Sequence, residues 1–379
     1  MKCSTLTMVY TALGLTALLI AAGCENSDVD TGFISPAETD SSNNYSAPIA
    51  TVIATDYSSG AVSLVATGTR AVTSNIQVVA PDTFCQYDNI TGYMYLISRL
   101  GSDAVTVLDT ANNYQPIGQY SVEAGTNAQG IAVVSTEKAF VPRLGSPELQ
   151  IVHPTNGTEL GRIDLSGYAD ADGIPDASQA VYKDGIVYVT LERIDPNWSP
   201  TEYSSVLLIN STTNAVIDEI RLTGKNPTGI LRYNDVADAF ILVETGVYGV
   251  LDGGIETMTA DGTLSGLVIT EETLGGDVVD AIITAPNVGF AVIAVPTDTG
   301  AVTQLVAFNP STGIKLSTLI QSTGYDLSFL SLNGNGELWV ADRNPSAPGI
   351  RIFDTATVLE LTAIPVDVGL PPLMVCFNR

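Results

Sequence analysis

The sequence predicts an all-β fold, a seven-bladed β-propeller that starts near residue 49 and runs to residue 379. Short runs of β-branched and aromatic residues alternate with Gly, Asn, Asp and Ser turns, as in strand arrays. One pattern recurs, in which an apolar run ends in Asp or Asn, a turn follows and a new strand begins, as at Val206–Ser211, Leu305–Pro310 and Ile350–Thr355. Four strands per period of roughly 40 to 50 residues indicate a propeller.

The innermost strand of a blade recurs near residues 83–88, 128–134, 178–182, 228–233, 279–284, 326–332 and 371–377. The last copy lies at the C-terminus, so we expect its partner strands to come from the other end of the propeller. The predicted partners are Thr51–Thr55, Val62–Ala66 and Thr73–Val79. Closing the ring in this way removes free sheet edges that would template aggregation.

Residues 1–23 have the composition of a secretory signal peptide. Lys2 supplies a positive charge, an uncharged apolar stretch follows, and the small residues Ala21–Gly23 precede Cys24. This order defines a signal peptide, and the apolar run is short for a transmembrane helix, which needs about 20 residues. We therefore expect an exported protein.

The four residues Ala21–Cys24 resemble the bacterial lipobox, although Leu is commoner at the position of Ala21. The resemblance implies a lipoprotein in which Cys24 carries lipid and residues 24–48, which are polar, form a flexible tether. Glu25 resembles the residue that sorts such proteins to the outer membrane, so we expect a lipid-anchored protein there or at the cell surface. The alternative is an ordinary signal peptide with Cys24 incidental.

The charge balance argues against a nucleic-acid partner. The formal net charge is -26 and the chain has one histidine. Such a surface repels nucleic acid and anionic lipid. It is also the composition of a surface adapted to a saline habitat, which we prefer to a specific role in cation binding.

The repeats resemble those of YVTN-type propellers, close in pattern to the surface-layer and lactonase-like seven-bladed proteins. The resemblance covers about residues 50–379 and is weaker at Val250–Val295. It implies the fold but no activity, since propellers host many unrelated functions.

Two cysteines remain once Cys3 leaves with the signal peptide and Cys24 carries lipid. Aligning inner strands places both Cys85 and Cys376 at the position of Leu231 in blade 4. We therefore predict a disulfide between adjacent inner strands, because exported cysteine pairs tend to bridge. The alternative is two buried, reduced thiols, if their Cα atoms lie beyond about 7 Å.

Arginines follow the second strand in several blades, and we predict that they share one repeat position on one face of the ring. A cluster of guanidinium groups there could bind a carboxylate or a phosphate. The alternative is that each arginine pairs with protein carboxylates. The residues are Arg99, Arg143, Arg193 and Arg343.

The run Asp170–Asp176 resembles a calcium loop, with alternating Asp residues followed by Gly173. Asp170, Asp172 and Asp176 are candidate Ca²⁺ ligands. The run lacks the distal Glu of an EF-hand, and a solvated loop without metal is the alternative.

The long loop 194–203 carries Trp198, which we predict to contact a ligand or a partner on the same face as the arginines. The alternative is that the indole ring of Trp198 packs against its own loop.

These observations favour a binding or scaffold propeller at the cell envelope rather than an enzyme. The sequence shows no nucleophile elbow and no His-rich metal cluster, so we name no catalytic residue. The competing hypotheses are a lactonase-like or other metal-dependent hydrolase on the propeller face, and a subunit of a larger envelope complex.

Overall fold

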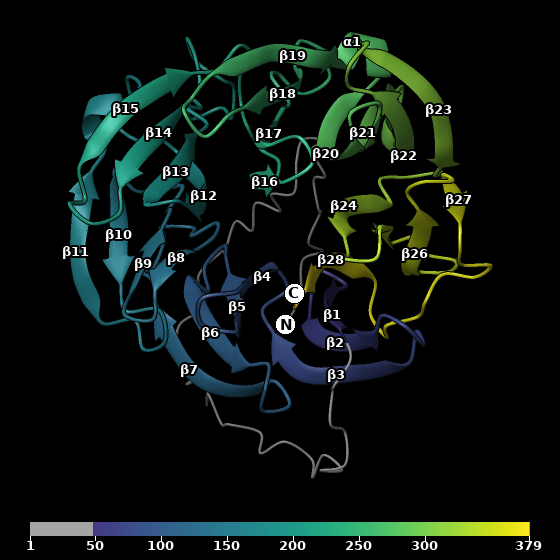
Figure 1. Cartoon of the computed structure of the whole chain (residues 1–379), viewed down its shortest axis with the longest axis horizontal. Coiled ribbons are helices and arrows are strands. Elements are labelled where there is room, and N and C mark those ends of the chain that lie inside the picture. Colours follow the sequence, from purple (N-terminus) through teal and green to yellow (C-terminus); the bar gives the residue numbers. More distant parts are fainter. Residues whose placement is uncertain (1–47, 379) are drawn as a thin grey trace, which may run out of the picture. The chain divides into compact units, whose positions relative to one another are not determined.

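A computed structural model describes residues 48–378, which form seven four-stranded antiparallel sheets arranged in a ring (Figure 1). The chain is a seven-bladed β-propeller. The signal peptide, Cys24 and most of the tether lie outside the described residues. Within the described part, no helix is long and apolar enough to span a membrane.

The first three blades follow one another along the chain. Blade 1 contains β4 (Thr83–Asp88), β5 (Tyr93–Ser98), β6 (Ala104–Asp109) and β7 (Gln115–Ser121). Blade 2 contains β8 (Ala132–Ser135), β9 (Lys138–Val141), β10 (Glu148–Val152) and β11 (Glu159–Asp164), followed by a short 3-10 helix (Ser166–Tyr168). Blade 3 contains β12 (Ala177–Lys183), β13 (Ile186–Leu191), β14 (Ser205–Asn210) and β15 (Val216–Arg221).

The next three blades repeat the arrangement. Blade 4 contains β16 (Arg232–Asn234), β17 (Ala239–Glu244), β18 (Gly254–Met258) and β19 (Leu264–Thr270), followed by helix α1 (Glu271–Leu274). Blade 5 contains β20 (Asp277–Ala285), β21 (Val288–Thr297), β22 (Gly300–Asn309) and β23 (Ile314–Gln321). Blade 6 contains β24 (Leu327–Leu332), β25 (Glu337–Asp342), β26 (Gly349–Asp354) and β27 (Leu359–Glu360).

Blade 7 joins the two ends of the described chain, as the repeat pattern predicts. Its inner strand β28 (Pro372–Phe377) pairs with β1 (Ile49–Thr55), which continues to β2 (Gly60–Ala66) and β3 (Val72–Val79). The register places Phe377 opposite Ala50. Beyond it, the Ile49 amide donates to Asn378 Oδ1 at 2.8 Å. The ring is therefore closed by strands from opposite ends of the sequence.

The predicted inner strands match the structure except in blades 2 and 4. In blade 2, residues 128–134 are predicted, but β8 starts only at Ala132. In blade 4, residues 228–233 are predicted, but pairing starts only at Arg232. Pro227 has no amide hydrogen to donate. A Cβ atom on Gly229 would lie 2.5 Å from the Val243 side chain, so the segment packs against its neighbour too closely to form a regular ladder.

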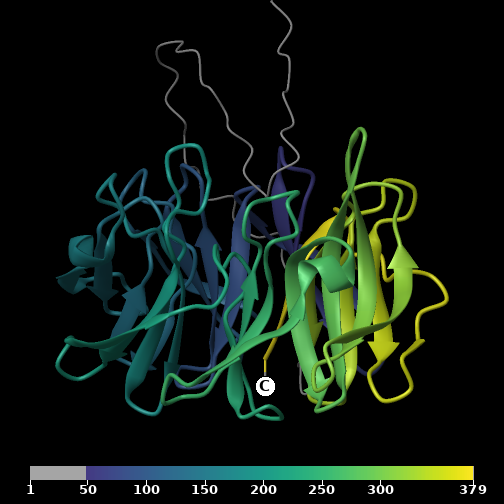
Figure 2. The ribbon, with the colours of Figure 1, turned by 90° about the horizontal axis from the view of Figure 1, so that it is seen from above.

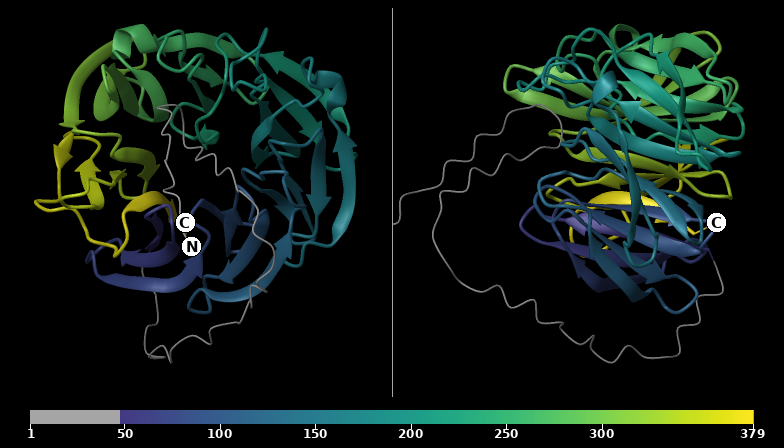
Figure 3. Two further views of the ribbon diagram at one scale, coloured as in Figure 1. Left: turned by 180° about the vertical axis from the view of Figure 1, so that it is seen from behind. Right: turned by 90° about the vertical axis from the view of Figure 1, so that its left-hand side faces the viewer.

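The hydrophobic core lies between the blades, because each strand alternates its side chains between two neighbouring sheets. Between blades 3 and 4, for example, Tyr188 and Leu208 pack against Phe240 and Met258. The ring has two faces, seen edge-on in Figure 2 and in the right-hand view of Figure 3. We call the face with the blade-to-blade connections and the loops between second and third strands the crossover face, and the opposite one, which holds the C-terminus, the hairpin face.

Candidate functional site

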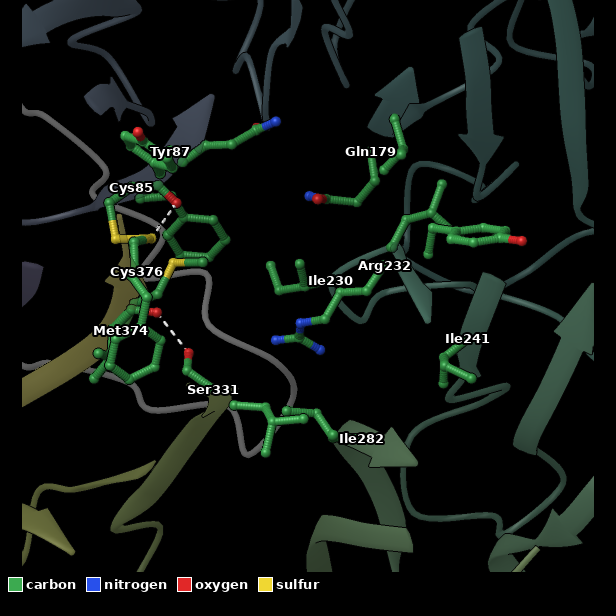
Figure 4. A pocket seen from close by; sticks show the side chains of 18 of the residues that line it. Cys85, Tyr87, Gln179, Ile230, Arg232, Ile241, Ile282, Ser331, Met374 and Cys376 are labelled. Atoms are coloured by element: carbon green, nitrogen blue, oxygen red, sulfur yellow. Dashed lines mark hydrogen bonds between the residues drawn. A yellow bond between two sulfur atoms is a disulfide. The ribbon is translucent and has the colours of Figure 1, made fainter. Parts of the chain in front are cut away.

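An axial cavity of about 300 Å³ runs between the inner strands (Figure 4). Tyr87, Asn89 and Asn234 line it where the inner strands end, and Asn89 is exposed, so the cavity opens on the hairpin face. Toward the crossover face, Phe84 meets Phe329 edge to face, with 5.1 Å between ring centroids. The guanidinium of Arg99 covers Phe84 at 3.7 Å.

Glutamine side chains form the wall contributed by blades 1 to 3. Gln86 Oε1 accepts a hydrogen bond from the Ile131 amide at 3.2 Å, and Gln179 Nε2 donates to the Gln129 carbonyl at 3.3 Å. The Gln86 amino group and the Gln179 carbonyl make no further hydrogen bond within the described residues. Each glutamine therefore keeps one polar group for a ligand.

Arg232 forms the opposite wall. Its two terminal nitrogens bind both oxygens of Asp280 at 2.6 and 2.8 Å, and one of them also donates to the Leu330 carbonyl at 2.9 Å. Asp280 is fully buried and accepts the amides of Ala281 and Leu330 as well. This pairing holds the guanidinium in place and cancels its charge.

The cavity's remaining lining is mostly apolar and includes a disulfide. Ile230, Ile282 and Met374 line it, together with Cys85 and Cys376. The two cysteines are bonded, with Cα atoms 6.1 Å apart on adjacent inner strands. The predicted bridge is thus confirmed, and the alternative of reduced thiols is not what the structure shows.

No carboxylate, imidazole, amine or free thiol lines this part of the described chain. The phenols of Tyr87 and Tyr233 are the lining groups that could transfer a proton, and the pKa of each is raised, for Tyr87 mainly by burial and for Tyr233 mainly by its hydrogen bond to Asp238. What the lining offers is hydrogen bonding by amides and packing on apolar walls. The arrangement is suited to holding a molecule.

The four predicted arginines lie on the crossover face, but not at one repeat position. The first residue after the second strand donates its amide to the carbonyl that precedes the first strand. Arg99 and Arg343 occupy this position, whereas blade 3 has Glu192 there, with Arg193 one residue later. In blade 2 the equivalent amide is that of Leu144, which donates to the Asn127 carbonyl, so Arg143 lies one residue before it. All four arginines thus follow the second strand of their blade, as predicted, but Arg143 and Arg193 differ by one residue in register from Arg99 and Arg343. A shift of one residue turns a side chain to the other side of its strand.

Each of these guanidinium groups has partners inside the protein. Arg99 pairs with Asp82 at 2.6 Å and Arg143, fully buried, pairs with Glu123 at 2.7 Å. Arg193 stacks on the Tyr203 ring at 3.8 Å. These contacts fit the structural alternative, and ligand binding at these arginines stays a prediction.

Arg343 differs in binding only backbone carbonyls. It donates to Thr55 at 2.9 Å and to Pro371 and Pro372 at 3.3 Å, and it lies over the Tyr57 ring at 4.4 Å. It therefore joins blade 6 to the two innermost strands of blade 7, β28 and β1.

The run Asp170–Asp176 binds its own backbone. Asp170 accepts the amide of Asp172, and Asp172 accepts that of Ile174. Asp176 is buried, which raises its pKa to about 7, and it accepts the Ile194 amide at 2.9 Å. Among residues 48–378, no group of three or more His, Cys, Asp or Glu side chains is arranged to hold a metal ion. Calcium at this loop stays a prediction.

Trp198 is 47% exposed, at the tip of the long loop of blade 3 on the crossover face. The loop is held by hydrogen bonds that the Asn197 and Ser199 amides donate to Asp195 Oδ1. Its predicted contact with a partner is not tested by this arrangement.

Sequence reasoning missed the residues that line the cavity. The signal was present, since aligning blades 1 and 4 pairs Gln86 with Arg232 on strands expected to be innermost. A polar side chain at that position must face either the axis or a neighbouring blade. Only the ring shows that both face the axis, together with Gln179 from blade 3.

Several solved structures have a similar fold. Hydrazine synthase of Kuenenia stuttgartiensis matches with a TM-score of 0.57 and 14% identity, over 78% of this chain and 86% of that one. A functionally unknown protein from Desulfotomaculum acetoxidans matches with a TM-score of 0.56 and 10% identity, over 87% of this chain and 98% of that one. Virginiamycin B lyase from Staphylococcus aureus matches with a TM-score of 0.50 and 10% identity, over 75% of this chain and 86% of that one. No family model matches the sequence, and no curated protein matches it. The likeness therefore shows the fold alone.

Proposed function

We propose that this protein is an envelope-anchored binding module that holds a small, uncharged, polar molecule in its axial cavity. The observation that supports it is the lining, in which unpaired amide groups face an arginine whose charge is cancelled by Asp280. Ligand sites of this kind are concave, largely apolar and carry a few placed polar groups. The net charge of -26 also disfavours anions.

Export and lipid anchoring through Cys24 complete the proposal. The disulfide is in keeping with an oxidising compartment, and the described chain begins at the hairpin face, beside its own end. We expect a Cys24→Ser variant of the full chain to move from the membrane fraction to the soluble fraction. If this variant stays with the membrane as the unchanged protein does, the anchor proposal is wrong.

A pair of matched substitutions tests the binding role. Ile230 lines the cavity (Figure 4), whereas Ile217 lies on the outermost strand of blade 3 and is 54% exposed. The full-length protein is equilibrated with a pool of neutral metabolites, and retained molecules are identified by mass spectrometry. We expect the unchanged protein and Ile217→Trp to retain a molecule that Ile230→Trp does not. Equal retention by both variants, or none by the unchanged protein, would contradict a binding role for the cavity.

A further inference from the structure

We propose that the axial cavity selects a planar ring whose edge carries an N–H group beside a carbonyl, as in a lactam or a pyrimidine base. This inference rests on the proposed function, because it names the class of molecule that the same cavity would hold. Three features of the cavity carry it, namely its glutamine pair, the free face of Arg232 and the apolar walls.

The hydrogen-bond network fixes how the two glutamines present their amides. Gln86 must place its oxygen on the Ile131 amide, because only an oxygen accepts that bond. Gln179 must place its nitrogen on the Gln129 carbonyl, because only the amino group donates. Gln86 therefore offers an N–H donor to the cavity, and Gln179 offers a carbonyl acceptor.

The two side-chain amides come near one another at Gly130. A Cβ atom built on Gly130 would lie 3.6 Å from Gln86 Oε1, the oxygen that accepts from Ile131, and 3.9 Å from Gln179 Oε1. In the proposed complex, Gln86 Nε2 and Gln179 Oε1 meet one ligand edge. A ring edge that pairs with them needs a carbonyl for Gln86 and an N–H for Gln179. A polyol could also bond to either amide, but only an edge with adjacent donor and acceptor satisfies both in one plane.

Arg232 offers a flat surface together with one N–H donor, since its Nε makes no hydrogen bond within the described residues. Its two terminal nitrogens are engaged in the guanidinium plane by Asp280 and Leu330. The flat faces of the guanidinium are therefore left for stacking. Figure 4 shows Arg232 and Gln179 both reaching toward the middle of the cavity, across from Cys85. A guanidinium face stacks on planar π systems. Because Asp280 balances the charge, the preferred ring is neutral.

The walls and the volume fit a single ring. Ile230 and Ile282 present flat aliphatic surfaces, and Met374 is flexible and adapts to the shape of its partner. The cavity volume of about 300 Å³ is at the small end of the range for ligand sites. A one-ring heterocycle is the size of molecule that such a space holds.

The test uses uracil, 1,3-dimethyluracil and glucose as probes, with binding to the full-length protein measured by isothermal titration calorimetry. Dimethyluracil has the same flat ring but no N–H to donate to Gln179. We expect uracil to bind and dimethyluracil to bind at least about tenfold more weakly, since an unmet buried hydrogen bond costs about 1 to 3 kcal/mol.

Two variants separate the ring class from the cavity itself. Gln179→Leu should weaken uracil binding about tenfold. Gln119→Leu, at an exposed position on β7, should leave the affinity for uracil unchanged. Uracil and dimethyluracil binding equally well, or uracil failing to bind, would overturn the ring class. Glucose binding that is weakened by Ile230→Trp would overturn the ring class but uphold the proposed function. If no probe shows binding that depends on the cavity, both the ring class and the proposed function are overturned.

Discussion

Two interfaces of the ring differ in how completely their polar groups are paired. One is the closing seam at blade 7, and the other is the contact between blades 3 and 4. At the seam, β28 pairs with β1, is bridged to β4 by the disulfide, and receives hydroxyl hydrogen bonds from Ser328 and Ser331 of blade 6. Arg343 adds three more bonds to backbone carbonyls. Each donor and acceptor in these contacts of the seam therefore has a hydrogen-bond partner.

The contact between blades 3 and 4 contains a less well-matched group. Glu244 and Glu256 are both fully buried there. Glu256 accepts the amide and hydroxyl of Thr223 at 3.0 and 2.5 Å, but neither oxygen of Glu244 has a hydrogen-bond partner. Burial, and then the charge of Glu256, raise the pKa of Glu244 well above its ordinary value. Glu244 is therefore held as the neutral acid, facing the Glu256 carboxylate.

The difference follows from chain connectivity. Blades 3 and 4 are consecutive, so a short covalent connection keeps them together whatever their interface contains. The strands of blade 7 come from opposite ends of the propeller, and bringing them together costs loop-closure entropy that only contacts can offset. We infer that the seam is built for closure, while the interior contact tolerates a buried acid pair.

The largest expected effect comes from breaking the disulfide. The bridge spans 291 residues, and in the entropic account a loop of this size stabilises the folded state by about 5 to 6 kcal/mol. We expect Cys85→Ala with Cys376→Ala to lose stability of this order in urea denaturation. Because removing both thiols avoids an unpaired cysteine, a loss below about 1 kcal/mol would show that the strand contacts alone close the ring.

A smaller effect is expected from Arg343. Arg343→Met should cost about 2 to 3 kcal/mol, since three carbonyls of blade 7 lose a charged donor. Arg193→Met is the matched control on the same face, because Arg193 stacks on Tyr203 and its guanidinium donates to no carbonyl among the described residues. Its cost should be about 1 kcal/mol. Equal costs, compared by thermal unfolding, would contradict a special role for the seam.

The smallest effect concerns Glu244 and depends on pH. Its carboxyl ionises near 4.5 in the unfolded chain but keeps its proton to higher pH when folded. Its contribution to stability is therefore complete below about pH 4.5 and declines as the pH rises toward the raised pKa. Glu244→Gln keeps the donor without the charge, so its melting temperature should exceed that of the unchanged protein by a margin that grows from pH 5 to pH 9.

Glu202→Gln, at an exposed position, serves as the control for that pH series. It should track the unchanged protein at every pH, because an exposed carboxylate pays no desolvation on ionising. A constant difference between Glu244→Gln and the unchanged protein from pH 5 to 9 would show that Glu244 is not held protonated.

Strand positions could be predicted closely because turns and alternating apolar runs are local signals. The predicted segments 83–88 and 371–377 differ from β4 and β28 by at most one residue. Blade 4 was harder, since Gly229 packs on Val243 from another strand, which no local pattern reveals. The exact register of the four arginines was hidden for the same reason, because equivalence between blades depends on hydrogen-bond pairing rather than on spacing along the chain.

By itself, the sequence determined the all-β class, the number of blades and the closure of blade 7, and it favoured the bridge between Cys85 and Cys376 that the structure confirms. Repetition fixes these properties, since each repeat must bury its apolar faces against the next. Only the tertiary structure decided that Gln86, Gln179 and Arg232 share one cavity and that Asp280 cancels the charge of Arg232. These residues come from four blades, and their distances depend on how the sheets are arranged around the axis.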